Sequence, residues 1–339
     1  MNGGKSQPGA LEPVIDHGWY RGRAVLVLGG LGFIGRNLSR SLARAGAKLT
    51  VATRRRRVHA HEALELESSG ARVVEADLRD GRTIRSVVER QEVIFNLAAR
   101  SGAVRSVRDP VTDLDVNCRG SLVLLEALRA KNRDARLVFV GSRLEYGCSG
   151  ADPVAEDRPA DPLCAHAIHK LRVESYLRVY GRLFTLRSAV ARISNPYGPG
   201  QPIGRTAYGV VNRLIHLALA GQTLTVYGDG SQRRDYIYVD DVVAALLSLG
   251  ISASSEARAY NVGTGIGTRF IDMARAIVAA AGSGRIELAE WPRLAQQVET
   301  GDFIADVSRI KRELGWAPVV SLEEGLQRTV SFYRAQVAS

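Results

Sequence analysis

Two side chains that can handle protons stand four residues apart in the segment DPLCAHAIHKLRVESY, namely His166 and Lys170. The segment predicts a helix over about 165–181, and residues spaced by four share one helix face. An imidazole can accept and donate a proton near neutral pH, and a neighbouring ammonium group lowers its pKa by disfavouring the imidazolium. The pair therefore favours acid/base chemistry, with the alternative that His166 only fills space.

Glycines in AVLVLGGLGFIG stand between an apolar run and the start of a predicted helix. Gly29, Gly32 and Gly35 permit a tight turn there and a close approach of the backbone to a pyrophosphate at the helix N-terminus. Gly30, Gly32 and Gly35 also read as GxGxxG, which alone is weak evidence. Its position inside a strand–helix–strand unit favours dinucleotide binding over a merely flexible turn.

Apolar strand-like runs that alternate with helical stretches must position these groups. The runs lie at 24–29, 48–53, 72–77, 92–98, 136–142 and 186–194, and the helices between them include one over about 113–131. Strands this apolar predict a parallel sheet covered on both faces. The fold class is therefore α/β, with a doubly wound (Rossmann) sheet.

The rhythm changes after Asn195, which predicts a smaller mixed α/β C-terminal substrate domain that includes a helix over 207–220. We expect segments 236–249 and 259–263 to return to the main sheet. The resulting division gives 23–194 plus about 235–263 to the cofactor domain and about 195–234 plus 264–339 to the substrate domain. Residues 1–22, rich in Gly, Pro and polar residues, predict a poorly ordered tail.

Several further motifs resemble one known family. They are GGLGFIG, EADLRD, NLAA, VGSRLEYG, RISNPYGPGQ, VYGDGSQRRDYIYVDDV, YNVGTG and LGWAPVVSLEEGL, spread from about Ala24 to Tyr333. Together they resemble the NAD(P)-dependent epimerase/dehydratase family of extended short-chain dehydrogenases/reductases. The resemblance is specific for the family and much less so for the reaction. It implies hydride transfer at a carbinol carbon of a sugar-like, nucleotide-activated substrate.

The resemblance assigns catalytic roles to Ser142 and Lys170, although a serine at a strand end can also cap a helix. His166 stands where the family has its catalytic tyrosine. Imidazole can replace that tyrosine as acid/base, and the alternatives are proton transfer by Tyr146, by Glu145 or by water. A further alternative is loss of activity with cofactor binding retained.

The cofactor contacts implied by the resemblance favour NADP(H) over NAD(H). Thr53 stands where members that prefer NAD carry an acidic residue, and Arg54 to Arg57 follow it. A hydroxyl group and guanidinium groups suit a 2′-phosphate. The alternative is a solvated basic loop. The remaining expected contacts are Asp77 and Leu78 at the adenine, with Phe33, Ile34, Leu97, Ala98, Ala99 and Lys170 along the rest of the cofactor.

On the substrate side, the resemblance places Asn195 and Arg234 at the nucleotide diphosphate, with Arg143 also expected to contact substrate. The alternative for Arg234 is a cap on a surface turn. Gln296 and Gln297 stand near the place of a further family arginine, so phosphate anchoring is expected to weaken or to move to Arg293. Arg143 and Leu144 follow Ser142 where dehydratases carry an Asp-Glu pair, which disfavours sugar dehydration.

Three functions remain open at this point. Epimerisation of a nucleotide sugar through a keto intermediate is preferred, and the alternatives are an NADPH-dependent ketoreductase and a catalytically impaired NADP-binding protein. The helices over 113–131 and 165–181 resemble those of the family's dimer interface, so we expect a homodimer.

Composition sets limits on partners and compartment. The chain has 339 residues and a formal net charge of +11, but its basic residues are spread along nearly the whole sequence, which argues against a nucleic-acid face. No run approaches the length of a membrane span, and no signal peptide is evident. Three scattered cysteines indicate reduced thiols rather than disulfides or a metal site. These features predict a cytoplasmic enzyme.

Overall fold

The main sheet of the computed structural model, which describes residues 17–201, 209–252 and 257–337, has seven parallel strands. They run in the order β3-β2-β1-β4-β5-β6-β10. Their bounds are β1 Ala24–Leu28, β2 Lys48–Thr53, β3 Arg72–Glu75, β4 Val93–Asn96, β5 Arg136–Ser142, β6 Arg187–Ile193 and β10 Arg258–Val262. The order reverses between β1 and β4, which confirms the predicted doubly wound sheet.

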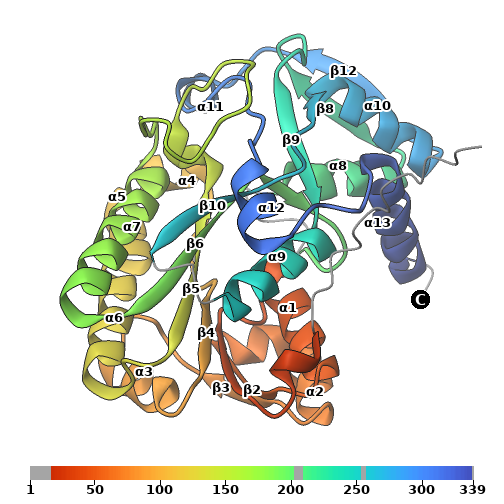
Figure 1. Cartoon of the computed structure of the whole chain (residues 1–339). Coiled ribbons are helices and arrows are strands. Elements are labelled where there is room, and N and C mark those ends of the chain that lie inside the picture. Colours follow the sequence, from red (N-terminus) through yellow and green to blue (C-terminus); the bar gives the residue numbers. More distant parts are fainter. Residues whose placement is uncertain (1–16, 202–208, 253–256, 338–339) are drawn as a thin grey trace, which may run out of the picture.

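Helices cover both faces of this sheet (Figure 1). They include α1 Phe33–Arg44, α2 Ala60–Ser68, α3 Gly81–Val88, α4 Ala103–Arg108, α5 Pro110–Asp113, the π-helical turn η3 Leu114–Arg119, α6 Gly120–Lys131, α7 Ala165–Phe184, α9 Val239–Ile251 and α12 Ser308–Leu314. Along β1, Val25 and Val27 belong to the core under α1 and α9, whereas Leu26 and Leu28 belong to the core under α6 and α7. This alternation follows from the two-residue period of a strand, and burial on both faces explains the apolar runs of the sequence.

A second group of elements lies beyond the carboxyl ends of the main strands (Figure 1). Here β7 Asn195–Tyr197, β9 Arg233–Tyr238 and β11 Gly267–Arg269 form one small sheet, and β8 Thr223–Tyr227 pairs with β12 Arg285–Ala289. The helices are α8 Val210–Leu219, α10 Phe270–Ala281, α11 Arg293–Gln297 and α13 Leu322–Val337. Leu214, Met273 and Tyr333 share a separate apolar core in this group.

The expectation that segment 236–249 returns to the main sheet is wrong for its strand. β9 pairs with β7 in parallel and with β11 in antiparallel orientation, so it belongs to the small sheet. Only α9 returns, and Val242, Leu246 and Leu249 pack in the core of the main sheet. Segment 259–263 does join the main sheet, as β10 beside β6.

The N-terminal tail predicted for residues 1–22 ends earlier than expected. His17–Tyr20 form a 3-10 turn, and the hydroxyl group of the buried Tyr20 donates to the carbonyl oxygen of Leu247 at 2.7 Å. Tyr20 belongs to the core of the main sheet, and Trp19 packs against that core and against Tyr20. These two aromatic side chains explain why residues 17–20 are ordered. Residues 1–16 lie outside the described part of the chain, as do residues 207 and 208 of the predicted helix over 207–220.

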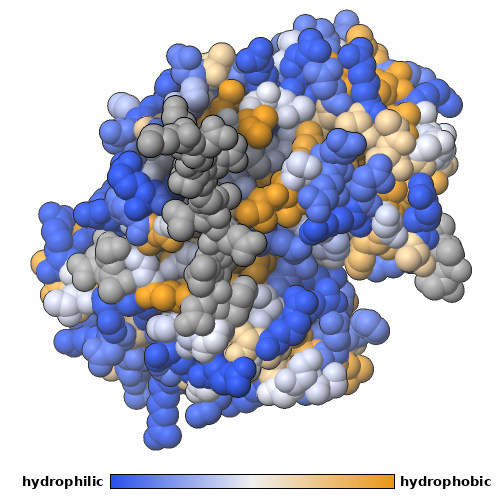
Figure 2. All heavy atoms as spheres, turned by 45° about the vertical axis from the view of Figure 1, so that its right-hand side comes forward, coloured by the Kyte–Doolittle hydropathy of each residue, from blue (hydrophilic) through white to orange (hydrophobic). Residues whose placement is uncertain are grey.

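The face of the molecule in Figure 2 shows mostly hydrophilic side chains, with apolar ones in small separate patches. Within the described residues, no helix is both long and apolar enough to cross a membrane.

Candidate active site

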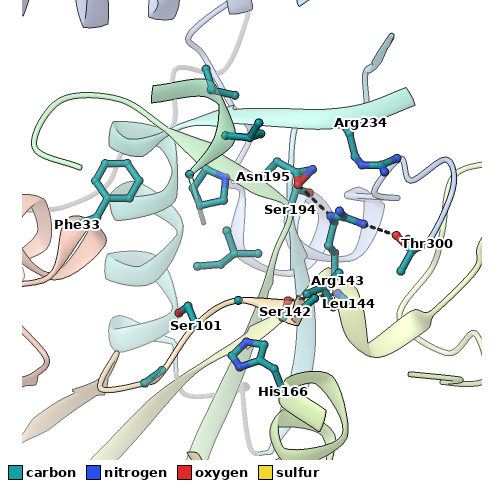
Figure 3. A pocket seen from close by; sticks show the side chains of 18 of the residues that line it. Phe33, Ser101, Ser142, Arg143, Leu144, His166, Ser194, Asn195, Arg234 and Thr300 are labelled. Atoms are coloured by element: carbon teal, nitrogen blue, oxygen red, sulfur yellow. Dashed lines mark hydrogen bonds between the residues drawn. The ribbon is translucent and has the colours of Figure 1, made fainter. Parts of the chain in front are cut away.

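A cavity of about 560 Å³ lies at the carboxyl ends of the main strands, facing the second group of elements. One side comes from the β1–α1 turn and from residues that follow β4 and β5, and the other from β9 and the segment 298–300. Ligands of doubly wound proteins bind at this edge, where the strand order reverses. Figure 3 shows side chains from both sides directed into the same space.

At this edge the backbone of the glycine turn between β1 and α1 lies very close to the backbone of neighbouring residues. Gly29 has a φ of +76°, and a Cβ added there would lie 2.8 Å from the amide nitrogen of Ala98. A Cβ on Gly35 would lie 2.2 Å from the carbonyl oxygen of Gly29. The next helix, α1, begins at Phe33 with its N-terminus at the cavity. This cradle fits the diphosphate of a dinucleotide, because free amide groups and the helix dipole favour an anion.

Most of the predicted cofactor residues lie at or beside the cavity. Gly29, Gly32, Phe33, Ile34, Gly35, Leu97, Ala99 and Lys170 line the cavity. Ala98 lies against the glycine turn instead, with its backbone beside Gly29.

The residues expected at the adenine end lie outside this cavity. Thr53 is buried at the end of β2, and Arg54 and Arg55 after it are exposed. Asp77 is held by the Arg79 guanidinium at 2.7 Å, and this hydrogen-bonded pair lowers the pKa of Asp77. Leu78 is buried against Gly120. An adenine contact by Asp77 therefore has to compete with Arg79.

Ser142 ends β5 and lines the cavity, and it also caps the following 3-10 turn. Its hydroxyl oxygen accepts from the amide of Leu144 at 3.2 Å, and its own amide donates to the buried carboxylate of Glu145 at 2.7 Å. A role for Ser142 as a cap is thus compatible with a catalytic role. The cap fixes the backbone that presents its hydroxyl group to the cavity.

His166 and Lys170 line the same cavity as Ser142, and Figure 3 shows His166 near Ser142. The Lys170 ammonium donates to the carbonyl oxygen of Val140 at 2.7 Å, and burial lowers the pKa of Lys170 to about 8. Burial, with a smaller effect of the Lys170 charge, lowers the pKa of His166 to about 4. A neutral imidazole able to accept a proton therefore faces the cavity at neutral pH.

Three groups that sequence reasoning missed stand behind His166. Asn117 Nδ2 lies 3.2 Å from His166 Nδ1, and the buried carboxylate of Asp113 lies 3.9 Å from the same nitrogen. His169 Nδ1 lies 2.7 Å from the other oxygen of Asp113. Asp113 ends α5 and Asn117 lies in the π-helical turn η3, a local distortion that often accompanies functional sites.

The alternative proton carriers Tyr146 and Glu145 have to be corrected, because neither lines the cavity. Tyr146 is 1% exposed, and its hydroxyl group donates to Asn261 at 2.7 Å. Glu145 is fully buried, and burial together with the adjacent Glu174 raises its pKa well above the usual value. Both side chains turn inward because the capped 3-10 turn directs only Ser142, Arg143 and Leu144 to the cavity.

The three residues predicted for substrate binding all line the cavity (Figure 3). Arg143 Nε donates to Asn195 Oδ1 at 3.0 Å, and its Nη1 donates to Thr300 Oγ1 at 2.9 Å. Burial and the nearby Arg234 charge lower the pKa of Arg143 to about 9. Arg234 forms an ion pair with Glu299.

The expectation that phosphate anchoring moves to Arg293 needs correction. Arg293, Gln296 and Gln297 are exposed on α11, and none of them lines the cavity. The segment 298–300 after α11 lines it instead. The second cation at this wall, beside Arg234, is therefore Arg143.

Comparison with known proteins gives a consistent result. The family model described as the NAD dependent epimerase/dehydratase family matches residues 25–263. A UDP-glucose 4-epimerase of Mycolicibacterium smegmatis is 35% identical over 316 residues, which cover 91% of this chain and 98% of that protein.

Solved structures agree with this match. A UDP-glucose 4-epimerase of Thermotoga maritima with UDP-glucose has a TM-score of 0.83 and 30% identity, covering 93% of this chain and 99% of that one. A UDP-glucose 4-epimerase of Thermus thermophilus in complex with NAD has a TM-score of 0.81 and 32% identity, covering 92% and 99%.

Proposed function

The chain belongs to the NAD-dependent epimerase/dehydratase family, and on this premise we propose that it epimerises a nucleotide-activated sugar at a carbinol carbon through a keto intermediate. The observation that carries the proposal is one cavity in which the glycine cradle, Ser142, His166 and Lys170 meet two arginines. The sugar 4-epimerases among its relatives support the substrate class.

Ser142, His166 and Lys170 each have a role in the proposed reaction. A nicotinamide cofactor held by the glycine cradle would supply a reversible hydride acceptor for the carbinol carbon. Ser142 Oγ hydrogen-bonds the reacting oxygen, and His166 accepts the hydroxyl proton as the carbonyl forms. Lys170 would hold the nicotinamide ribose, and burial together with the smaller effect of the Lys170 charge keeps His166 neutral. After the keto sugar turns, His166 returns the proton to the oxygen as the hydride reaches the opposite face.

The opposite wall suits an anionic substrate. Two guanidinium groups, Arg143 and Arg234, face one carboxylate, Glu299, so this wall carries a net positive charge. Arg143 has only neutral hydrogen-bond partners among the described residues. A nucleotide diphosphate supplies the missing negative charge, and planar guanidinium groups bind phosphate in pairs of hydrogen bonds.

We also propose that the cofactor is NADP(H) in preference to NAD(H). Thr53 at the end of β2 carries no charge, and neither Arg54 nor Arg55 forms an ion pair with a residue in the described ranges. Free guanidinium groups beside a hydroxyl group suit a 2′-phosphate. This preference also keeps a second function open, a ketoreductase that consumes NADPH at each turnover.

The deciding experiment begins with purified full-length protein that is denatured to release and identify its nucleotide. The protein is then incubated with UDP-glucose and related nucleotide sugars, and the products are separated by chromatography. A new epimer with no net change in nicotinamide absorbance supports epimerisation. Stoichiometric NADPH consumption with a keto sugar supports the ketoreductase. Absence of any hydride transfer leaves only the NADP-binding protein and overturns both enzymes.

A homodimer through α7 and the segment that contains η3 and α6 is our proposal for the assembly. These elements pack side by side and leave Leu114 and Leu183 exposed at 47% and 68%. Apolar side chains on adjacent helices favour burial against a second copy. Light scattering after size exclusion should give twice the chain mass, and Leu183→Glu should give the monomer mass. A monomeric parent protein would contradict the proposal.

We further propose a cytoplasmic location. Cys118, Cys148 and Cys164 are all free thiols. Reduced cysteines suit a reducing compartment.

A further inference from the structure

The amide of Asn117 is fully engaged without His166. Its Oδ1 accepts from the amide nitrogen of Arg100 at 2.8 Å, which fixes which end of the amide is oxygen. Its Nδ2 donates to the carbonyl oxygen of Arg100 at 2.9 Å and to Asp113 Oδ1 at 2.9 Å. An amide nitrogen has only two hydrogens, and both are used in these two bonds. Asn117 Nδ2 therefore has no hydrogen left to donate to His166 Nδ1, although the two nitrogens lie 3.2 Å apart.

Asp113 has one engaged oxygen and one open oxygen. Oδ1 accepts from Asn117 and lies 2.7 Å from His169 Nδ1. Oδ2 is buried and has no hydrogen-bond partner among the described residues. It lies 3.9 Å from His166 Nδ1, so a shift of about 1 Å brings the pair to hydrogen-bond distance. A buried carboxylate oxygen without a partner is unfavourable, which drives such a shift.

We propose that Asp113 is a positioning residue that keeps Nδ1 of His166 protonated, so that Nε2 faces the cavity as a proton acceptor. This inference rests on the proposed function only for its catalytic consequence. The arrangement follows the general logic by which a buried carboxylate sets the tautomer of a histidine base. The other titratable groups around His166 are His169, Lys170 and the Cys164 thiol, which is hydrogen-bonded to the backbone of His166. The backbone of Arg100 also hydrogen-bonds His166.

The proton balance of the step is complete with these groups. The hydroxyl proton of the substrate moves to His166 Nε2 as the carbonyl bond forms, and a bound nicotinamide cofactor would accept the C–H electron pair as hydride. The imidazole ring of His166 then carries two N–H groups and a positive charge, and its Nδ1 proton stays in place. Asp113 remains a carboxylate and stabilises that charge. The reverse step returns the proton from Nε2.

Asp113→Asn tests the proposal with little change in shape. The amide oxygen can still accept from Asn117 and His169, while the amide nitrogen replaces Oδ2 and donates to His166 Nδ1. This reverses the tautomer and leaves an N–H at Nε2. ¹⁵N NMR of histidine-labelled full-length protein with NADP+ reads the tautomer directly, and loss of the signals in His166→Gln assigns them. We expect Nδ1–H in the parent protein and Nε2–H in Asp113→Asn.

Kinetics give the second readout. Asp113→Asn should lower kcat by about a hundredfold or more and change KM by less than about threefold, because a wrong tautomer impairs chemistry and not binding. Asp115→Asn is the matched control from η3, since its carboxylate bonds to Arg79 and Arg119 and not to His166. In a His166→Tyr background, Asp113→Asn should change kcat by less than about threefold, because a phenol has no tautomers.

The outcomes separate this inference from the proposed function. An Nε2–H tautomer in the parent protein, or the same tautomer in parent and Asp113→Asn, overturns the role of Asp113. The first of these needs no variant, so it applies even where Asp113→Asn fails to fold. A tautomer that switches as expected in a protein without turnover on any nucleotide sugar supports the positioning role and overturns the proposed function.

Discussion

The carboxylate of Glu299 forms an ion pair with the guanidinium group of Arg234 at the wall of the cavity. The protein itself therefore neutralises one of the two arginine charges there, and Arg143 carries the other. A substrate phosphate has to compete with this carboxylate, which also repels it. We therefore expect Glu299→Gln to lower the dissociation constant for UDP by about three- to tenfold, as measured by titration calorimetry. Glu290→Gln, an exposed position outside the cavity, is the control. Weaker binding by Glu299→Gln would show that the pair orders Arg234 for the phosphate.

The end of β2 should control the choice of cofactor. Thr53→Asp places a carboxylate where the ribose of the adenosine half is expected, which repels a 2′-phosphate and accepts from a free 2′-hydroxyl group. We expect affinity for NADP+ to fall about tenfold or more and affinity for NAD+ to rise, as measured by fluorescence titration. Arg72→Gln, at the exposed first residue of β3, should leave the ratio of the two affinities nearly unchanged. A parent protein that already prefers NAD+ contradicts the argument.

Gly35→Ala should disrupt the cradle. The added Cβ lies 2.2 Å from the carbonyl oxygen of Gly29, so α1 has to move away from the turn. Overpacking of this kind costs about 1–3 kcal/mol in stability, and the displaced amides lose the diphosphate. We expect a lower Tm and no co-purified nucleotide. Gly81→Ala is the control, because its Cβ would meet nothing closer than 3.6 Å. Normal nucleotide content in Gly35→Ala would refute the cradle.

Acid should destabilise the protein through His166. Its pKa is about 4 in the folded protein against 6.5 ordinarily, so between these values the unfolded chain binds a proton that the folded protein does not. Stability is therefore present above pH 6.5 and is lost as the pH falls toward 4, by on the order of 3 kcal/mol.

Urea unfolding at pH 7 and at pH 4.5 measures this loss. His166→Gln should lose less stability over the interval than the parent protein, whereas His61→Gln, at an exposed position, should behave like the parent. Equal losses in the parent and His166→Gln would mean that other groups carry the acid sensitivity.

The sequence predicted the main sheet well because its signals are local. Each strand buried on both faces is a short apolar run, and the glycine turn fixes where the first helix starts. The pairing of β9 with β7 and β11 depended on long-range contacts, and its apolar residues looked no different from those of a strand in the main sheet. That ambiguity explains the misplaced strand.

The site was predictable only where a motif carried it. The glycine turn and the His166–Lys170 pair follow from local patterns, and the roles expected of Ser142 and Lys170 follow from the family resemblance. Asp113 meets His166 across 53 residues, and Arg234 meets Glu299 across 65. No periodic pattern marks such pairs, and the π-helical turn that contains Asn117 has no clear signature in sequence.

The two walls of the cavity also differ in how freely they can change. The wall at the glycine cradle is built from backbone at separations that exclude a single methyl group at Gly29 or Gly35. The opposite wall consists of side chains from three segments distant in the chain, at Arg143, Arg234 and Glu299 to Thr300. Replacement of residues on one of these segments alters the shape and charge offered to a sugar nucleotide and leaves the dinucleotide cradle intact. Selection can therefore diversify substrates on this scaffold in small, independent steps.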